Sequence, residues 1–194
     1  MNRAPDFGKS YFQGELVKLV VPDLDRDGVL LSDWTRDSEY FRLAMAEPAH
    51  YRYPDSQKKW LEEANQQGYL MMIVTQADQK TIGEVELCDI NPASGNAWLS
   101  IGIGERDFWG KKYGREAVKL IMDYAFMILN LQRLSLNVFE YNKRALKVYQ
   151  KLGFVIEGCE KKWLNRDGKR WDMIYMGILK QDWLLMNPLE TINQ

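Results

Sequence analysis

The chain has 194 residues, of which 46% are hydrophobic, and its 26 basic and 27 acidic residues leave a formal charge of −1. This length suits one domain with a full hydrophobic core, so residues 1–194 are expected to form a single domain. The nearly balanced charge gives no field that would draw the protein to nucleic acid or to an anionic membrane, and neither is expected as a partner.

The first third of the chain is predicted to hold one strand followed by helices. After a loose lead-in at about residues 1–12, an apolar run predicts a strand over 15–21. Apolar residues at helical spacing over 24–46 are interrupted near 32–35, which predicts two short helices. A third helix is expected to start at Ser56, whose side chain is predicted to cap it.

The middle of the chain has the pattern of three consecutive strands. Strand-like runs cover 69–75, 81–90 and 97–104, and polar turns at 77–80 and 91–95 separate them. Short connections of this kind join antiparallel neighbours, so the three strands are expected to form a meander.

A long amphipathic helix is predicted over 113–129, with a wide apolar stripe that packs on the sheet. A strand is predicted over 133–140. The next helix is expected to begin after Asn142, a favourable N-cap residue, and to end at Gly153, because glycine readily adopts the left-handed conformation that ends a helix.

The last predicted element is a hairpin of two strands over 155–164 and 170–179, joined by the turn at 165–168. The predicted fold class is therefore α+β. We expect a central mixed sheet that is twisted and mostly antiparallel, with helices on both of its faces.

The stretch Asp107-Phe-Trp-Gly-Lys-Lys-Tyr-Gly-Arg-Glu-Ala117 puts a glycine- and lysine-rich loop directly before the long helix. Unpaired N–H groups in the first turn of a helix, together with roughly half a positive charge from its dipole, favour an anion at this place. The loop also holds glycines and cationic residues suited to a pyrophosphate, namely Gly110, Gly114, Lys111, Lys112 and Arg115. The alternative is an ordinary helix start with a solvated charged face.

A second motif lies about thirty residues further on, where residues 142–154 read N-K-R-A-L-K-V-Y-Q-K-L-G-F. With the loop, it resembles the GNAT superfamily of acyl-CoA-dependent N-acetyltransferases. In that family a Q/R-x-x-G-x-G/A loop holds the pyrophosphate of coenzyme A, and an N-x-x-A-x-x-x-Y-x-x-x-G-F segment supplies further contacts. The matching residues of the second motif here are Asn142, Ala145, Tyr149, Gly153 and Phe154.

The resemblance extends to the RimJ/RimL-like branch, which includes ribosomal-protein alanine N-acetyltransferases and spermidine N-acetyltransferases. It implies a GNAT-like sheet and transfer of an acetyl group from acetyl-CoA to a primary amine, by direct attack in a ternary complex. The acceptor is left open between a protein N-terminus and a polyamine or other small amine. The residues that the resemblance places at acetyl-CoA are Ile101, Ile103, Trp109, Gly110, Lys111, Lys112, Tyr113, Gly114, Arg115, Asn142 and Lys151.

Three positions depart from the family pattern. Lys112 stands where the middle loop glycine is usual, and Trp109 stands where the first glutamine or arginine is usual. Trp98 occupies a position early in the preceding strand where the family often has an acidic residue, so one candidate base is missing.

Candidate catalytic residues follow from the chemistry of acetyl transfer, which needs a neutral amine and a proton for the departing thiolate. Tyr149 occupies the family's tyrosine position for that proton, although the helical apolar face that carries it also allows a purely structural role. Glu84 and Glu86 alternate on one strand face and are candidate bases, with Glu86 expected to lie deeper. The favoured alternative for both is an exposed strand face.

The acceptor side is predicted only by residue type. Four aromatic residues are candidate walls of a slot, Trp34, Tyr51, Tyr53 and Trp98, and four acids are candidate attractors of a cation, Glu39, Glu47, Glu84 and Glu86. A non-catalytic acyl-CoA-binding module for sensing or assembly is the alternative function. A homodimer is one expectation, because Trp163 and Trp171 on the hairpin would suit an interface.

Two cysteines and a single histidine limit the remaining chemistry. Cys88 and Cys159 lie far apart and are expected to be buried thiols, and His50 alone makes no multi-histidine metal site, so no metal is expected. The N-terminal residues do not have the pattern of a secretory signal, and the apolar stretch 120–131 is too short to cross a bilayer. We therefore expect a soluble cytoplasmic protein.

Overall fold

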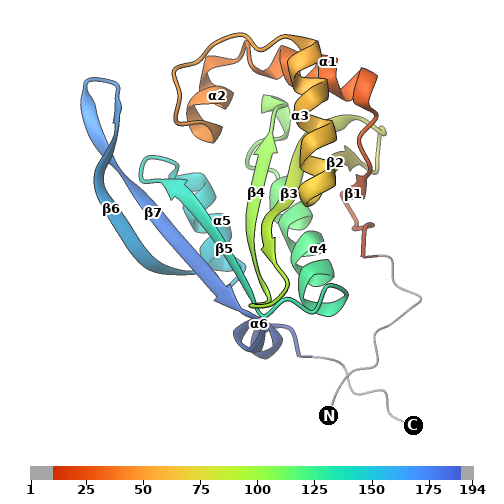
Figure 1. Ribbon diagram of the computed structural model, residues 1–194, viewed down its shortest axis with the longest axis vertical. Helices are drawn as coiled ribbons and strands as arrows, with labels where there is room; N and C mark the ends of the chain where they lie inside the picture. Colours follow the sequence, from red (N-terminus) through yellow and green to blue (C-terminus); the bar gives the residue numbers. More distant parts are fainter. Residues whose placement is uncertain (1–10, 189–194) are drawn as a thin grey trace.

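The computed structural model describes residues 11–188, which form a seven-stranded sheet with helices on both faces (Figure 1). The strand order is β1-β2-β3-β4-β5-β7-β6. The strands are β1 (Val17–Val20), β2 (Tyr69–Thr75), β3 (Thr81–Asn91), β4 (Asn96–Ile103), β5 (Arg133–Phe139), β6 (Val155–Arg166) and β7 (Lys169–Leu179). All neighbouring strands pair antiparallel except β4 and β5, which are parallel, so the predicted α+β class is confirmed.

Six α-helices and one short 3-10 helix connect or flank these strands in the described part of the chain. The helices are α1 (Leu24–Trp34), α2 (Ser38–Ala44), α3 (Pro54–Gln67), η1 (Arg106–Phe108), α4 (Tyr113–Met127), α5 (Lys143–Lys151) and α6 (Lys180–Met186). None of them is long and apolar enough to cross a membrane.

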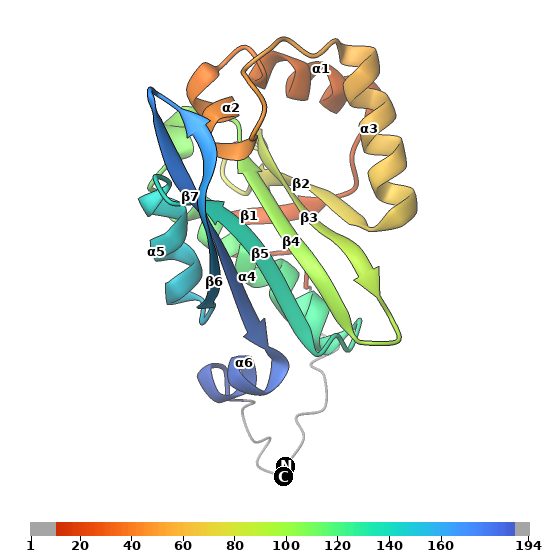
Figure 2. The same cartoon turned by 60° about the vertical axis from the view of Figure 1, so that its left-hand side comes forward.

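Different helices pack on the two faces of the sheet (Figure 2). The side chains of each strand alternate between these faces, so each face supplies its own core. On one face, Val85 and Leu87 of β3 join the core that packs against α4. On the other face, Leu70 and Met72 of β2 pack with Leu61 of α3. The apolar stripe predicted for α4 is confirmed over most of its length, since Ala117, Ile121 and Ala125 are fully buried, whereas Ile128 lies beyond the end of the helix and is exposed.

β4 and β5 pair only at their first residues, and this split positions the functional site. Their register joins residues 96–98 to residues 133–135, and no pair follows. In Figure 1 the two strands meet near the bottom of the view and diverge upward. One edge of β4 beyond Trp98 therefore faces β5 without a strand partner.

Local chemistry moves two of the predicted helix boundaries. α3 begins at Pro54, not at Ser56, because proline has no N–H to lose in the first turn and its φ already suits a helix. The Ser56 hydroxyl donates to the Tyr53 carbonyl instead of capping the helix. The break between α1 and α2 falls at residues 35–37, where the Asp37 carboxylate accepts from the backbone N–H groups of Glu39 and Tyr40 and so caps α2.

The two ends of the described chain and the cysteines bear on three further points. Most of the predicted lead-in, residues 1–10, lies outside the described residues, whereas Phe12 packs on Tyr124 with ring centroids 5.0 Å apart. The short helix α6 was not predicted from the sequence. The expectation of buried thiols was wrong, because Cys159 lies on the exposed edge strand β6 and Cys88 is only half-buried.

Candidate active site

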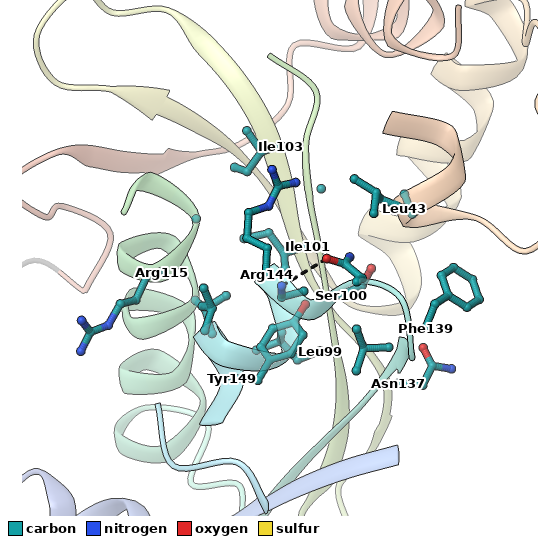
Figure 3. Close-up of a pocket in the computed structure, with 18 of the residues that line it drawn as sticks. Leu43, Leu99, Ser100, Ile101, Ile103, Arg115, Asn137, Phe139, Arg144 and Tyr149 are labelled. Atoms are coloured by element: carbon teal, nitrogen blue, oxygen red, sulfur yellow. Dashed lines mark hydrogen bonds between the residues drawn. The ribbon is translucent and has the colours of Figure 1, made fainter. Parts of the chain in front are cut away.

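A cavity of about 660 Å³ lies where β4 and β5 separate (Figure 3). It is lined on one side by the start of α4 and by α5, and on the other by α2. Figure 3 shows Arg144 and Tyr149 reaching in from α5, with Leu43 of α2 on the opposite side of β4. The cavity therefore passes through the sheet and connects its two faces.

The side towards α4 has the features of an anion site. Gly110 has φ +75°, and a Cβ at this position would meet no atom within 4 Å. Lys112 takes φ +73° at the N-cap of α4, where no side chain satisfies the first-turn N–H groups. These N–H groups and the positive end of the helix dipole favour a phosphate. Lys112 holds a left-handed conformation that costs a non-glycine residue free energy, as is common at binding sites.

Five cationic side chains line the cavity without a carboxylate partner. They are Lys112, Arg115, Arg144, Lys147 and Lys151, and none forms an ion pair with another residue of the described 11–188 segment. The Arg144 guanidinium lies 4.2 Å from the ring centre of Trp109, and burial lowers its pKa. In Figure 3 the charged end of Arg115 points away from the other labelled side chains, so its charge acts at the rim.

The structure places most of the predicted donor residues together. All of the residues that the sequence places at acetyl-CoA line the cavity except Lys111 and Tyr113. Tyr113 instead packs edge-on against Phe108, with ring centroids 5.1 Å apart. Asn142 lines the cavity and also caps α5, as predicted, by accepting from the Ala145 N–H at 3.2 Å. Contact with acetyl-CoA remains a prediction for each of them.

Tyr149 is the tyrosine of the second motif and lines the cavity from α5. It is 8% exposed, its ring packs on Phe154, and its hydroxyl forms no hydrogen bond with the described residues. Burial raises the pKa of the phenol to about 12, so it stays protonated at neutral pH. The hydroxyl is therefore available as a hydrogen-bond donor.

Glu84 is buried, which corrects the expectation that Glu84 and Glu86 form an exposed strand face. Its exposed fraction is 9%, and burial raises the pKa of its carboxyl to about 7. The Tyr40 hydroxyl donates to Glu84 Oε1 at 2.9 Å, while Oε2 has no partner among the described residues. Tyr40 lines the cavity.

Glu86 and Asp89 are the other acids of β3 on this side. Glu86 is half-buried, so the expectation that it lies deeper than Glu84 was wrong. Burial, and secondarily the negative charge of Asp89, raise the pKa of Glu86. Asp89 lines the cavity with φ +48°, at the irregularity where β3 and β4 lose register after Cys88. A bulge of this kind redirects a side chain, here towards the cavity.

The predicted aromatic slot is not assembled. Of its four members only Trp98 lines the cavity. Trp34 is buried under Gly104 and donates from Nε1 to Glu105 at 3.0 Å, whereas Tyr51 and Tyr53 are exposed and pack on each other. Neither Glu39 nor Glu47 lines the cavity.

α2 is held over the cavity from two sides. Near its start, Arg106 forms an ion pair with the capping residue Asp37. At its end, the Arg166 guanidinium from the hairpin tip donates to four backbone carbonyls, those of Arg42, Met45, Ala46 and Glu47. Arginine satisfies the carbonyls left unpaired where the helix ends, so the hairpin fixes the cavity wall.

Several polar residues of this cavity were missed by sequence reasoning, among them Tyr40, Asp89, Arg144 and Lys147. Arg144 lies inside the second motif and its charge was a usable signal. Tyr40 and Glu84 are 44 positions apart, and no local pattern indicates that they meet. Among residues 11–188, no cluster of His, Cys, Asp and Glu is placed to hold a metal ion.

Comparison with known proteins decides the family. The family described as "Acetyltransferase (GNAT) domain" matches residues 16–155. The chain belongs to this family. This GNAT protein is an N-acetyltransferase, as predicted, and the alternative of a non-catalytic binding module is set aside.

Two relatives of this N-acetyltransferase show how far the likeness in sequence extends. The spermidine N(1)-acetyltransferase of Escherichia coli (strain K12) is 41% identical over 85 residues, 44% of this chain and 45% of that protein. The SPbeta prophage-derived uncharacterized N-acetyltransferase YokL of Bacillus subtilis (strain 168) is 23% identical over 177 residues, 91% of this chain and 97% of that protein. The likeness to the Escherichia coli enzyme thus spans less than half of either chain.

A crystal structure of spermidine N-acetyltransferase from Vibrio cholerae, in complex with CoA and spermine, has the same fold. The TM-score is 0.78 at 25% identity, and the match covers 88% of this chain and 99% of that chain. The GNAT-like sheet predicted from the sequence is therefore confirmed.

Proposed function

We propose that this N-acetyltransferase transfers the acetyl group of acetyl-CoA to a primary amine of a cationic acceptor, by direct attack in a ternary complex. The observation that carries the proposal is the cavity through the β4–β5 split, with unpaired cations towards α4 and α5 and acids beside it on β3. An anionic donor and a cationic acceptor would thus bind on opposite faces of the sheet and meet within it.

The residues present fit acetyl-CoA as the donor. The start of α4 and the unpaired cations offer N–H groups and charge to its phosphates, and the open space at Gly110 lets the backbone approach them. The unpartnered edge of β4, at residues 99–103, offers backbone groups to the pantetheine and the thioester carbonyl. We propose that residues 1–194 act as one such domain.

Tyr149 is the proposed acid. Its protonated phenol would donate to the thioester sulfur and supply the proton as the C–S bond breaks and the thiolate leaves. Since the phenol is a weaker acid than a thiol, complete proton transfer is uphill. The hydrogen bond from the phenol to the developing thiolate therefore stabilises the transition state more than complete proton transfer does.

The acids of β3 are the proposed bases that remove a proton from the acceptor's ammonium group. Glu84 and Glu86 both have raised pKa values because of burial, which brings a carboxylate closer to the basicity that an amine requires. The chain needs no covalent intermediate, because the neutral amine can attack the thioester directly.

A polyamine is the favoured acceptor class in this proposal. Glu86 and Asp89 carry negative charge beside the cavity and form no ion pair within residues 11–188, so a second positive charge on the acceptor would find a partner there. The spermidine acetyltransferases among the relatives support the same class. A protein N-terminus, as in the RimJ/RimL-like branch, is the competing acceptor.

The proposal includes a homodimer in the cytoplasm. β6 is an edge strand that exposes Val155, Ile156 and Trp163, and exposed edges pair readily with another chain. Trp171 is partly buried and donates to the Arg166 carbonyl, so it supports the hairpin instead. Both cysteines are free thiols, as suits a reducing compartment.

The test is acetyl-CoA-dependent release of free thiol with spermidine, spermine and short peptides of varied N-termini. Turnover of the polyamines alone supports the favoured acceptor, and turnover of peptides alone replaces it. Tyr149→Phe should lower kcat roughly ten- to a hundredfold and leave acetyl-CoA affinity unchanged. Wild-type kcat in this variant would remove Tyr149 from its role.

A further inference from the structure

Tyr40 and Glu84 form a buried pair between the acceptor side of the cavity and the sheet. Tyr40 projects from α2 and lines the cavity, whereas Glu84 lies behind it on β3 and does not. Their hydrogen bond runs from the Tyr40 hydroxyl to Glu84 Oε1 at 2.9 Å. Glu84 therefore reaches the cavity only through Tyr40.

Gly102 on β4 makes room for this pair. It lies opposite Glu84 in the β3–β4 register and also lines the cavity, beyond the last residue that pairs β4 with β5. A Cβ at this position would stand 2.1 Å from Glu84 Oε1 and 2.8 Å from the Tyr40 hydroxyl oxygen. The pair thus lies directly over β4 where the donor's thioester is proposed to bind.

The hydrogen-bond inventory of the pair fixes the role of each oxygen. The single proton of Tyr40 is used by Glu84, so the phenol oxygen can only accept from a group in the cavity. Glu84 Oε2 is buried and unpaired in the described part of the chain, which leaves the carboxyl able to hold a proton.

Few charged or titratable groups lie near this pair. Tyr40 of α2 and Glu86 of the same strand act on Glu84, and Arg52, from the segment before α3, acts on Tyr40. β4 carries no ionisable residue, and β2 carries only Tyr69, at its far end. No cation among residues 11–188 forms an ion pair with Glu84.

We propose that Tyr40 binds the acceptor amine through its phenol oxygen and relays the amine's proton to Glu84. In this step an ammonium N–H bond breaks as the proton passes to Tyr40, and the Tyr40 proton passes to Glu84 Oε1. The ammonium and the carboxylate become a neutral amine and a carboxylic acid, so charge and atoms balance. The inference rests on the proposed function and names Tyr40 as a specificity-determining residue and Glu84 as its positioning partner.

The experiment compares Tyr40→Phe and Glu84→Gln with the wild type, using spermidine as the probe amine and acetyl-CoA as donor. Tyr124→Phe is the matched control, because its hydroxyl interacts with Tyr69 outside the cavity. Both test variants should lower kcat/KM for spermidine at least roughly tenfold and keep the affinity for acetyl-CoA, while the control keeps both. The double variant should be no slower than either single one, since the pair acts as a unit.

The pH profile separates a relay from a packing role. Wild-type kcat/KM should rise with pH through the ionisation of Glu84, near pH 7, and this limb should vanish in Glu84→Gln. In Tyr40→Phe the limb should vanish as well, because Glu84 does not line the cavity and phenylalanine has no oxygen that could pass the proton on to it. An unchanged limb and wild-type kcat/KM in Tyr40→Phe would overturn the relay while leaving acetyl transfer established.

Calorimetric binding of spermidine to the CoA-bound protein distinguishes the remaining cases. If the wild type binds spermidine without acetylating any amine, and Tyr40→Phe binds it at least tenfold more weakly, amine recognition by Tyr40 stands, whereas proton relay and the proposed function fail. If the wild type neither binds nor acetylates any amine of the panel, both proposals fail.

Discussion

Replacing Glu84 with glutamine should stabilise the folded protein at alkaline pH but not at acidic pH. Burial raises the pKa of this carboxyl from 4.5 to about 7, so the fold favours its neutral form. Glutamine keeps the shape and the oxygen that accepts from Tyr40, but it never carries a charge. The variant therefore isolates the free energy of holding a carboxylate in this place.

The sign and the size follow from proton linkage. A raised carboxyl pKa gives the folded state more bound protons than the unfolded state between pH 4.5 and about 7, so the stability due to Glu84 is full below this window and is lost across it. A rise from 4.5 to about 7, at about 1.4 kcal/mol for each tenfold change in proton affinity, corresponds to about 3 kcal/mol.

Urea denaturation of wild type and variant between pH 4.5 and pH 8.5 measures this difference. We expect nearly equal free energies of unfolding at the acidic end, and an advantage of about 3 kcal/mol for Glu84→Gln at the alkaline end. Glu63→Gln on exposed α3 is the control and should show a small, constant difference, since its ion pair with Lys59 is a surface pair. If the difference in free energy of unfolding between wild type and Glu84→Gln does not change with pH, the proposed cost of the buried carboxylate is refuted.

Three further substitutions test the site from other directions. Lys112→Gly should raise the free energy of unfolding by about 1 kcal/mol, because it removes a non-glycine residue from the left-handed conformation, and it should weaken acetyl-CoA binding. Thermal unfolding measures the first effect and calorimetry the second. Unchanged affinity would show that Lys112 does not contact acetyl-CoA. Gly102→Ala should cost about 1–3 kcal/mol in denaturant unfolding by forcing Tyr40 from Glu84, and an undisturbed stability would contradict the close contact. Arg166→Lys should raise the KM for the amine more than that for acetyl-CoA in steady-state assays, because a lysine cannot hold the carbonyls at the end of α2; equal KM changes would exclude this role.

The strands and long helices could be predicted from the sequence because their signals are local. β2 and α4 begin where the patterns place them, at Tyr69 and Tyr113, and Asn142 caps α5 as its type suggests. Some of the wrong predictions also have local causes. Pro54 starts α3 two positions before Ser56, so the Ser56 side chain does not cap the helix. The helix α6 has only seven residues, and its buried Trp183 contacts Phe126 only once the core has folded.

The acceptor side could not be predicted because it depends on contacts between distant segments. The burial of Glu84 is set by α2, which is itself held by the hairpin tip through Arg166. An alternating strand pattern looks the same whether solvent or a helix covers that face. The donor side was easier, because its loop and the helix that follows are adjacent in the sequence.

The split between β4 and β5 has a consequence for the order in which ligands come and go. A cavity that opens on both faces of the sheet gives the donor and the acceptor separate entrances. Spent coenzyme A then need not wait for the acetylated amine to depart, nor the amine for coenzyme A. Steady-state patterns should therefore be those of sequential addition without a compulsory order, with coenzyme A competing against acetyl-CoA but not against the amine.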